Sequence, residues 1–393
     1  MKKALLITVL CCLTISLFSE SRISYLSWAA NVAKSDIKRN PEGWMIGFNK
    51  TPKWDYCQGL MCNALLKLNA ITKDNAYYDY ARTFGDYMVD NNGIVRTYNA
   101  SDNNLEQING AKFIFTLYDK TLKIKYFKAI EAFRAQLKTQ PRAGEGGFWH
   151  DAAYPNQMWL DDIYMASPFL AEYAKRFNEK ETLDDVIKQI ALITKHTCDP
   201  KTGLYYHAWN ESKTEDWANK TTGCSPTFFS RGMGWYMMAL VDVLDYMPLN
   251  HPKRPAMKRA LSNLAKSLLK YQDKTTGLWY QVTDKLGAEG NYLESSSTAM
   301  FMYAITKAAN KGYIDPSYFM LSKKTFNLFI KNAIRIDADG LYNVTKACAV
   351  AGLGGKPYRD GSYDYYIHEP QRDNDPTVIG PFILWCCQLA MIK

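Results

Sequence analysis

The sequence predicts an all-α protein: a closed (α/α)6 barrel made of six helical hairpins in a single domain. Three observations predict this fold. A turn centred on a glycine recurs along the whole chain, and a pair of helical segments lies between successive turns. The first segment of most pairs is apolar almost all round, whereas the second is amphipathic and rich in lysine, as expected for an inner and an outer ring of helices.

The repeated turn places a glycine before an apolar or aromatic pair, as in "KTTGLWY". The glycines are Gly43, Gly93, Gly147, Gly203, Gly277 and Gly340. We expect a positive φ at each, because glycine adopts it at little cost where a helix ends or a turn closes. In a ring these turns gather at one end, which predicts a cleft lined by aromatic residues there. The aromatic residues expected to line it are Trp44, Trp149, Tyr206 and Trp279.

Six pairs of segments have the spacing of apolar residues that predicts helices. The pairs are 57–72 with 75–89, 105–121 with 124–138, 159–177 with 182–197, 232–247 with 256–272, 296–313 with 317–334, and 377–392 with a segment that starts near Ile23. An open helical solenoid is the alternative architecture. Because the units end without evident capping repeats, the pattern favours closure.

Residues 1–21 have the basic start and the short apolar run of an export signal. Cys11 and Cys12 leave a lipid-anchored form open, although neither follows a small residue as lipid-attachment cysteines usually do. No later stretch reaches the ~18 consecutive apolar residues that a membrane helix requires. We therefore expect residues 22–393 to form a single exported, periplasmic domain without an integral membrane segment.

Composition excludes several other classes of protein. The cysteines that follow the signal are odd in number, which argues against a disulfide framework, and the histidines are too scattered for a zinc cluster. The net charge is +9, but the basic residues are spread singly, so nucleic acid is a poor fit. An acidic ligand or plain solubility would each account for the charge. Nothing in the sequence indicates the oligomeric state.

The stretch "QMWLDDIYMASPFL" sets two carboxylates, Asp161 and Asp162, inside an apolar segment. A buried carboxylate either keeps its proton or acquires a partner. Asp161 is the leading candidate for a catalytic acid. The competing interpretation is a carboxylate that stabilises the start of a helix through the helix dipole, and Asp162 fits that role equally well.

Other candidates also lie near the starts of inner segments. Arg231 has the fork that binds carboxylates, or it forms an internal salt bridge. His150 and His207 follow equivalent turns, which favours a shared site. Glu106 is placed to pair with Asp161 across the mouth of the barrel.

Glu106 and two aromatic candidates, Trp54 and Tyr56, each carry a second interpretation. Asp102 is a rival to Glu106, and a helix cap would explain either. Trp54 and Tyr56 fit the hydrophobic core as well as they fit an aromatic platform in the cleft.

Several long motifs closely resemble the unsaturated rhamnogalacturonyl hydrolases, glycoside hydrolase family 105, and more distantly the unsaturated glucuronyl hydrolases. These motifs are "YPNQMWLDDIYMASPFLAEYAKRF", "SRGMGWYMMALVDVLDYMP", "GLWYQVTDKLGAEGNYLESSSTAMFMYAITKAANKGYI" and "YIHEPQRDNDPTVIGPFILW". The resemblance spans nearly all of the chain after the signal and implies an (α/α)6 barrel. It also implies a substrate: lyase-generated oligosaccharides with a 4,5-unsaturated uronic acid, galacturonyl or glucuronyl, at the non-reducing end.

Carried onto this sequence, the resemblance implies that Asp161 is the general acid and base and that Asp162 is a bystander. It places the second acidic residue at Glu106, where the family usually has Asp in an N-L-D motif and this chain reads "NNLEQIN". The residues it implies around the unsaturated sugar are His150, Trp159, Met165, His207, Arg231 and Trp235.

The implied reaction is hydration of an enol ether, which needs proton transfers but no metal or organic cofactor. An apolar setting beside Trp159, together with the nearby Glu106, would keep the required proton on Asp161. A polysaccharide lyase of the same shape and a non-catalytic uronate-binding protein are the alternatives.

Overall fold

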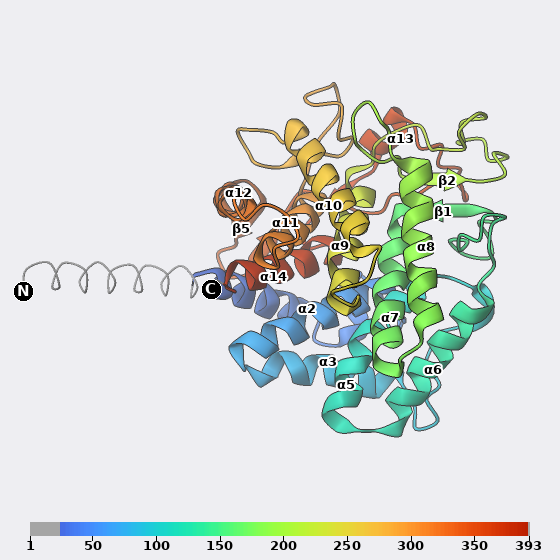
Figure 1. Cartoon of the computed structure of the whole chain (residues 1–393). Coiled ribbons are helices and arrows are strands. Elements are labelled where there is room, and N and C mark those ends of the chain that lie inside the picture. Colours follow the sequence, from blue (N-terminus) through green and yellow to red (C-terminus); the bar gives the residue numbers. More distant parts are fainter. Residues whose placement is uncertain (1–23, 392–393) are drawn as a thin grey trace, which may run out of the picture.

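The computed structural model describes residues 24–391, and within them the prediction of an all-α barrel is confirmed (Figure 1). The expected export signal, with Cys11 and Cys12, lies outside the described residues. None of the helices between residues 24 and 391 combines the length and the apolar character needed to cross a membrane. The cysteines in this range are all free thiols, and all but Cys198 are buried.

Six helical units form the inner ring. They are α2 (Tyr56–Thr72), α4 (Glu106–Asn109) continued by α5 (Lys112–Thr121), α7 (Leu160–Phe177), α9 (Ser230–Tyr246), α11 (Ser295–Asn310) and α14 (Pro376–Leu389). Each unit packs against the next, and α14 packs against α2, so the ring closes. In Figure 1 the red α14 lies beside the blue α2, so the last inner helix of the chain is the neighbour of the first.

An outer ring covers the inner one. Its helices are residues 24–39, α3 (Asn75–Met88), α6 (Ile124–Thr139), α8 (Lys180–Thr197), α10 (Arg254–Leu268) and α12 (Tyr318–Ala333). One hydrophobic cluster extends through both rings, from Tyr25 to Ala390. The inner helices α9 and α11 are buried along almost their whole length, as their apolar sequences predict.

The second inner segment, predicted as one helix over 105–121, is divided at Gly110 and Ala111. A side chain at Gly110 would collide with the indole ring of Trp54, and one at Gly59 of α2 would collide with the backbone of Asn109. The two inner units therefore approach each other closely at this point. That tertiary contact leaves no pattern of apolar residues in the sequence, which explains why the break was not predicted.

The turns at one end of the ring carry short antiparallel strand pairs, which the sequence did not predict. The strand pairs are β1 (Gln157–Trp159) with β2 (Ala208–Asn210), β3 (Trp279–Tyr280) with β4 (Leu293–Glu294), β5 (Ile334–Ile336) with β6 (Tyr342–Val344), and β7 (Ala347–Cys348) with β8 (Gln371–Arg372). The same turns hold the short helix α13 (Tyr363–His368), and three-residue 3-10 helices start at Gly43, Ala100 and Leu269. In Figure 1, β1, β2 and α13 lie together at the upper end of the barrel.

The repeated glycines fulfil the prediction of positive φ in four turns, those of Gly93, Gly203, Gly277 and Gly340. The prediction is wrong at Gly43 and Gly147. A Cβ at Gly147 would collide with the sulfur of Met158, and one at Gly43 would collide with Phe84, so these two positions need glycine for close packing.

Candidate active site

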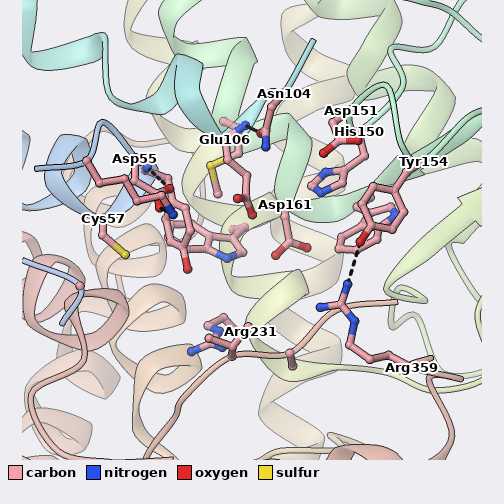
Figure 2. Close-up of a pocket in the computed structure, with 18 of the residues that line it drawn as sticks. Asp55, Cys57, Asn104, Glu106, His150, Asp151, Tyr154, Asp161, Arg231 and Arg359 are labelled. Carbon is pink, nitrogen blue, oxygen red and sulfur yellow. Dashed lines mark hydrogen bonds and ion pairs between the residues drawn. The ribbon is translucent and has the colours of Figure 1, made fainter. Parts of the chain in front are cut away.

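A cavity of about 380 Å³ opens at the end of the barrel where the inner helices begin. Figure 2 shows Glu106, Asp161 and Arg231 directed into the same space, although they come from three different helices. The residues predicted from the sequence that line it are Tyr56, Glu106, His150, Trp159, Asp161, Met165, Arg231 and Trp235. The starts of the inner helices therefore converge on one site.

Asp161 lies in the first turn of α7 with its side chain 14% exposed to the cavity. Its Oδ2 is 3.0 Å from Nε2 of His207, and Nδ1 of His207 is 2.6 Å from the hydroxyl of Tyr366. The antiparallel pairing of β1 with β2 sets Trp159 opposite Ala208, and this brings His207 beside Asp161. The result is a chain of hydrogen bonds that runs from the cavity into the core.

Asp162 is a structural anchor at the start of α7 and does not line the cavity, in agreement with its interpretation as a helix-start carboxylate. Its side chain is 4% exposed, and its Oδ1 lies 2.6 Å from Nδ1 of His150. Its Oδ2 accepts a hydrogen bond of 2.7 Å from the backbone N–H of Trp159, at the start of α7. Burial alone lowers the pKa of His150, but the charge of Asp162 and the hydrogen bond to it raise this pKa to about 9. His150 and Asp162 therefore form a buried ion pair.

The ion pair also fixes an aromatic wall of the cavity. The ring of His150 stacks on the indole of Trp159 with centroids 4.1 Å apart and an angle of 4° between the planes. The indole N–H of Trp159 donates to Gln157 Oε1 at 3.0 Å. The Trp159 face is thus held rigidly, as a surface that packs against a sugar ring requires.

Glu106 begins α4, and its backbone N–H donates to Asn104 Oδ1 at 2.8 Å. Burial raises the pKa of Glu106 to about 7, and the carboxylates of Asp55 and Asp161 add to the rise, while His150 opposes it. This wall of the cavity is therefore acidic, and Glu106 carries a proton below neutral pH.

Arg231 lies in the first turn of α9 and is 4% exposed. Its Nη1 donates to the carbonyl of Cys348 at 2.7 Å and to Thr377 Oγ1 at 2.9 Å. Within residues 24–391 it forms no ion pair, so the internal salt bridge considered as an alternative is absent from this range. A buried guanidinium that is fixed by neutral groups and lines a cavity is suited to bind an anionic group of a ligand.

Two predicted site residues lie elsewhere. Trp54 is 1% exposed, packs against Phe84 and Phe133, and donates its indole N–H to the carbonyl of Gln107, so it belongs to the core. His207 is fully buried behind Asp161 and does not line the cavity.

The prediction that the aromatic residues of the turns line the cleft is wrong. Trp44, Trp149, Tyr206 and Trp279 do not line this cavity, and Trp279 is fully buried with its N–H bonded to Leu268. The carboxylate of Glu294 lies at the start of an inner helix but caps α11, where it accepts from the backbone N–H groups of Ser296 and Ser297.

Further residues of the site were not predicted from the sequence. The polar residues among them are Asn49, Lys53, Asn104, Asp151, Tyr154, Arg359 and Arg372. Figure 2 shows the guanidinium of Arg359 hydrogen-bonded to the hydroxyl of Tyr154, at 3.1 Å, across a sequence separation of 205 residues. Arg372 belongs to the motif "YIHEPQRDNDP", which was singled out as a whole, so the sequence did contain a signal for it.

A helical barrel with a concave cavity, a rigid aromatic wall and converging carboxyl and guanidinium groups defines a carbohydrate-active enzyme. The chain belongs to glycosyl hydrolase family 88, whose family model matches residues 28–393. It is a glycoside hydrolase of the unsaturated uronyl hydrolase type.

Solved structures of this type share the fold. A family 105 glycoside hydrolase from C. acetobutylicum is 40% identical, with a TM-score of 0.89 over 93% of this chain and 99% of that one. The unsaturated glucuronyl hydrolase of Bacillus sp. GL1 is 13% identical, with a TM-score of 0.68 over 94% of this chain and 96% of that one, a likeness of fold alone.

Two curated relatives match over part of the chain. Protein Atu3128 of Agrobacterium fabrum is 34% identical over 226 residues, which are 56% of this chain and 96% of that protein. The unsaturated rhamnogalacturonyl hydrolase YesR of Bacillus subtilis is 28% identical over 176 residues, 44% of this chain and 48% of that protein.

Proposed function

We propose that this enzyme removes a 4,5-unsaturated uronic acid from the non-reducing end of oligosaccharides produced by polysaccharide lyases, with Asp161 as general acid and base. The observation that carries the proposal is that one cavity is faced by Asp161 and by Arg231, which forms no ion pair within residues 24–391. Arg231 would bind the carboxylate of the sugar and so place the C4=C5 bond beside Asp161. The names of YesR and of the Bacillus sp. GL1 enzyme support this class of substrate.

The reaction follows from the chemistry of the enol ether. Asp161 transfers its proton to C4, and the positive charge that develops at C5 is shared with the ring oxygen. The ionised Asp161 then takes a proton from a water molecule, whose oxygen bonds to C5. The resulting hemiketal opens to a ketone at C5 and leaves a hemiacetal at C1, which collapses to an aldehyde and releases the rest of the oligosaccharide as an alcohol.

The hydrogen bonds behind Asp161 support both of its roles. In both forms of Asp161, Nε2–H of His207 can donate to Oδ2, and the hydroxyl of Tyr366 can donate to Nδ1. Oδ1 is then the oxygen that carries the proton for C4 and later accepts one from water. A single tautomer of His207 therefore serves the acid and the base form of Asp161.

The proposal is tested by following the ultraviolet absorbance of the conjugated C4=C5 bond. We expect the absorbance to fall when the enzyme is mixed with unsaturated galacturonyl or glucuronyl oligosaccharides, because hydration destroys the conjugation. A rise in absorbance on intact polysaccharide would identify a lyase instead. Binding of the unsaturated oligosaccharides without any change in absorbance would identify a non-catalytic binding protein. The two oligosaccharides also show which uronate is preferred.

The pKa of Glu106 predicts a pH dependence. Because this pKa is about 7, Glu106 is neutral in acid and becomes charged as the pH rises through neutrality. The new charge would repel the carboxylate of the substrate, so we expect kcat/KM to fall above about pH 7 in wild type. In Glu106→Gln that decline should disappear.

The control for this pH profile is Asp102→Asn, a change at an exposed residue of the same turn. It should retain the decline. A decline of unchanged size in Glu106→Gln would assign the titration to another group.

A further inference from the structure

A second polar cavity, of about 290 Å³, lies at the opposite end of the inner ring. Its walls come from the later turns of the helices whose first turns form the active site: Glu172 of α7 and Asp242 of α9 are each eleven residues beyond Asp161 and Arg231. At a rise of 1.5 Å per residue, eleven residues place the two cavities about 16 Å apart along the barrel. The second cavity is therefore a separate space.

Lys112 of α5 is the unusual residue in this cavity. It is 7% exposed, and its Nζ lies 3.3 Å from the carbonyl oxygen of Tyr164 and 3.3 Å from the centroid of the Tyr164 ring. That carbonyl is available because Pro168, four residues further along α7, has no N–H to donate to it. A single carbonyl occupies one of the three N–H donors of an ammonium group.

The other charges that face this cavity are already neutralised by protein groups. Lys307 contacts Asp242 and Asp245, each at 2.6 Å. Glu172 contacts Arg176 at 2.6 Å and accepts from the hydroxyl of Tyr246 at 2.6 Å.

Two lysines remain without a carboxylate partner. Among the described residues no carboxylate lies within ion-pair distance of Lys112. The same holds for Lys67, which is exposed and lines the same cavity. Lys112 and Lys67 therefore have N–H donors available to a ligand, although the charges of Asp242 and Glu172 act on Lys112 at longer range.

We propose that this cavity binds a small oxyanion, of the carboxylate or phosphate class, through Lys112 and Lys67. Burial lowers the pKa of Lys112 to about 7, although the charges of Asp242 and Glu172 oppose this, and a bound anion in contact with Lys112 would favour its protonated form. The volume of the cavity accommodates inorganic phosphate or a single sugar acid. Asn63 and Thr116 line the same cavity and supply further polar contacts.

The experiment is a titration of the whole enzyme with inorganic phosphate, and separately with glucuronate, by calorimetry at constant ionic strength. We expect both anions to bind, and Lys112→Met to weaken the binding by about tenfold or more, because it removes a charge-assisted hydrogen bond. Methionine keeps the unbranched stem of lysine as far as Cε and removes only the ammonium group. If Lys112→Met does not fold, Lys67→Met at the exposed position provides the second variant, with a smaller loss expected.

Anion binding at Arg231 must be distinguished from binding in this cavity. We expect saturating phosphate to leave the KM of the enzyme for its oligosaccharide unchanged, and Lys112→Met to retain the wild-type KM. Equal affinity for phosphate in wild type and in both lysine variants would overturn the proposal, as would competition between phosphate and substrate. Lys112 would then serve only to bind the carbonyl of Tyr164. A failure of the anion titration leaves the absorbance assay unaffected.

Discussion

Asp161→Asn is expected to lower kcat by about 10³-fold or more while leaving KM within a few-fold of wild type. The amide has the shape of the carboxyl group but neither donates a proton to C4 nor accepts one from water. The fold should be unaffected, because the side chain is partly exposed and its protein partner is a single histidine, His207. The measurement is the fall in absorbance of the unsaturated sugar, together with thermal unfolding of both proteins.

Asp161→Glu serves as the matched variant, because it keeps the acid but displaces it by one methylene. We expect it to retain part of the activity. Turnover by Asp161→Asn within tenfold of wild type would refute the assignment of Asp161 as acid and base.

Asp162→Ala is expected to affect mainly stability rather than catalysis. We expect it to lower the free energy of unfolding by about 3–5 kcal/mol. The change leaves the buried His150 without its counterion, so that burial opposes its protonation, and removes the acceptor of the Trp159 N–H. The loss should be measured by urea unfolding. Asp161→Ala, at the neighbouring position, should cost far less, and equal costs at the two positions would contradict this role for Asp162.

The destabilisation caused by Asp162→Ala should also depend on pH. The pKa of His150 is raised from 6.5 in the unfolded chain to about 9 in the fold. The stabilisation by the ion pair is thus fully present below pH 6.5 and is lost as the pH rises through about 9. We expect the difference between wild type and Asp162→Ala to shrink over this range. If the difference in the free energy of unfolding stays constant from pH 6.5 to 9, the ion pair does not contribute to it. The hydrogen bond from the Trp159 N–H to Asp162 would then account for the whole difference.

The helices of both rings could be predicted from the sequence because each presents a long periodic pattern of apolar residues. The main site residues could be predicted once the helices were predicted, because a residue at the start of an inner helix faces the mouth of the ring. Glu106, Asp161 and Arg231 all lie at such starts. Trp54 comes just before another helix start, yet it packs inward against Gly110. The direction of one side chain depends on tertiary packing that local patterns do not describe.

The contacts that complete the site could not be predicted from local sequence patterns. His207 reaches Asp161 only through the pairing of β1 with β2, which are too short to show an alternating pattern. Tyr366 bonds to His207 across a separation of 159 residues. Both histidines were recognised as candidates, but the sequence did not distinguish the one that lines the cavity, His150, from the one that lies behind Asp161.

The contact between α14 and α2 has a consequence for how this protein folds. The first and last inner helices touch although nearly the whole chain separates them, and the wall of the catalytic cavity runs from Gly47 to Arg372. Contacts between residues so far apart in the sequence form slowly, because closing the long loop between them costs entropy before the contacts add any stability. A chain still emerging from the ribosome therefore lacks a catalytic cavity until α14 has been synthesised and docked. Removal of α14 alone should abolish activity, although every residue assigned to proton transfer would remain in the shortened chain.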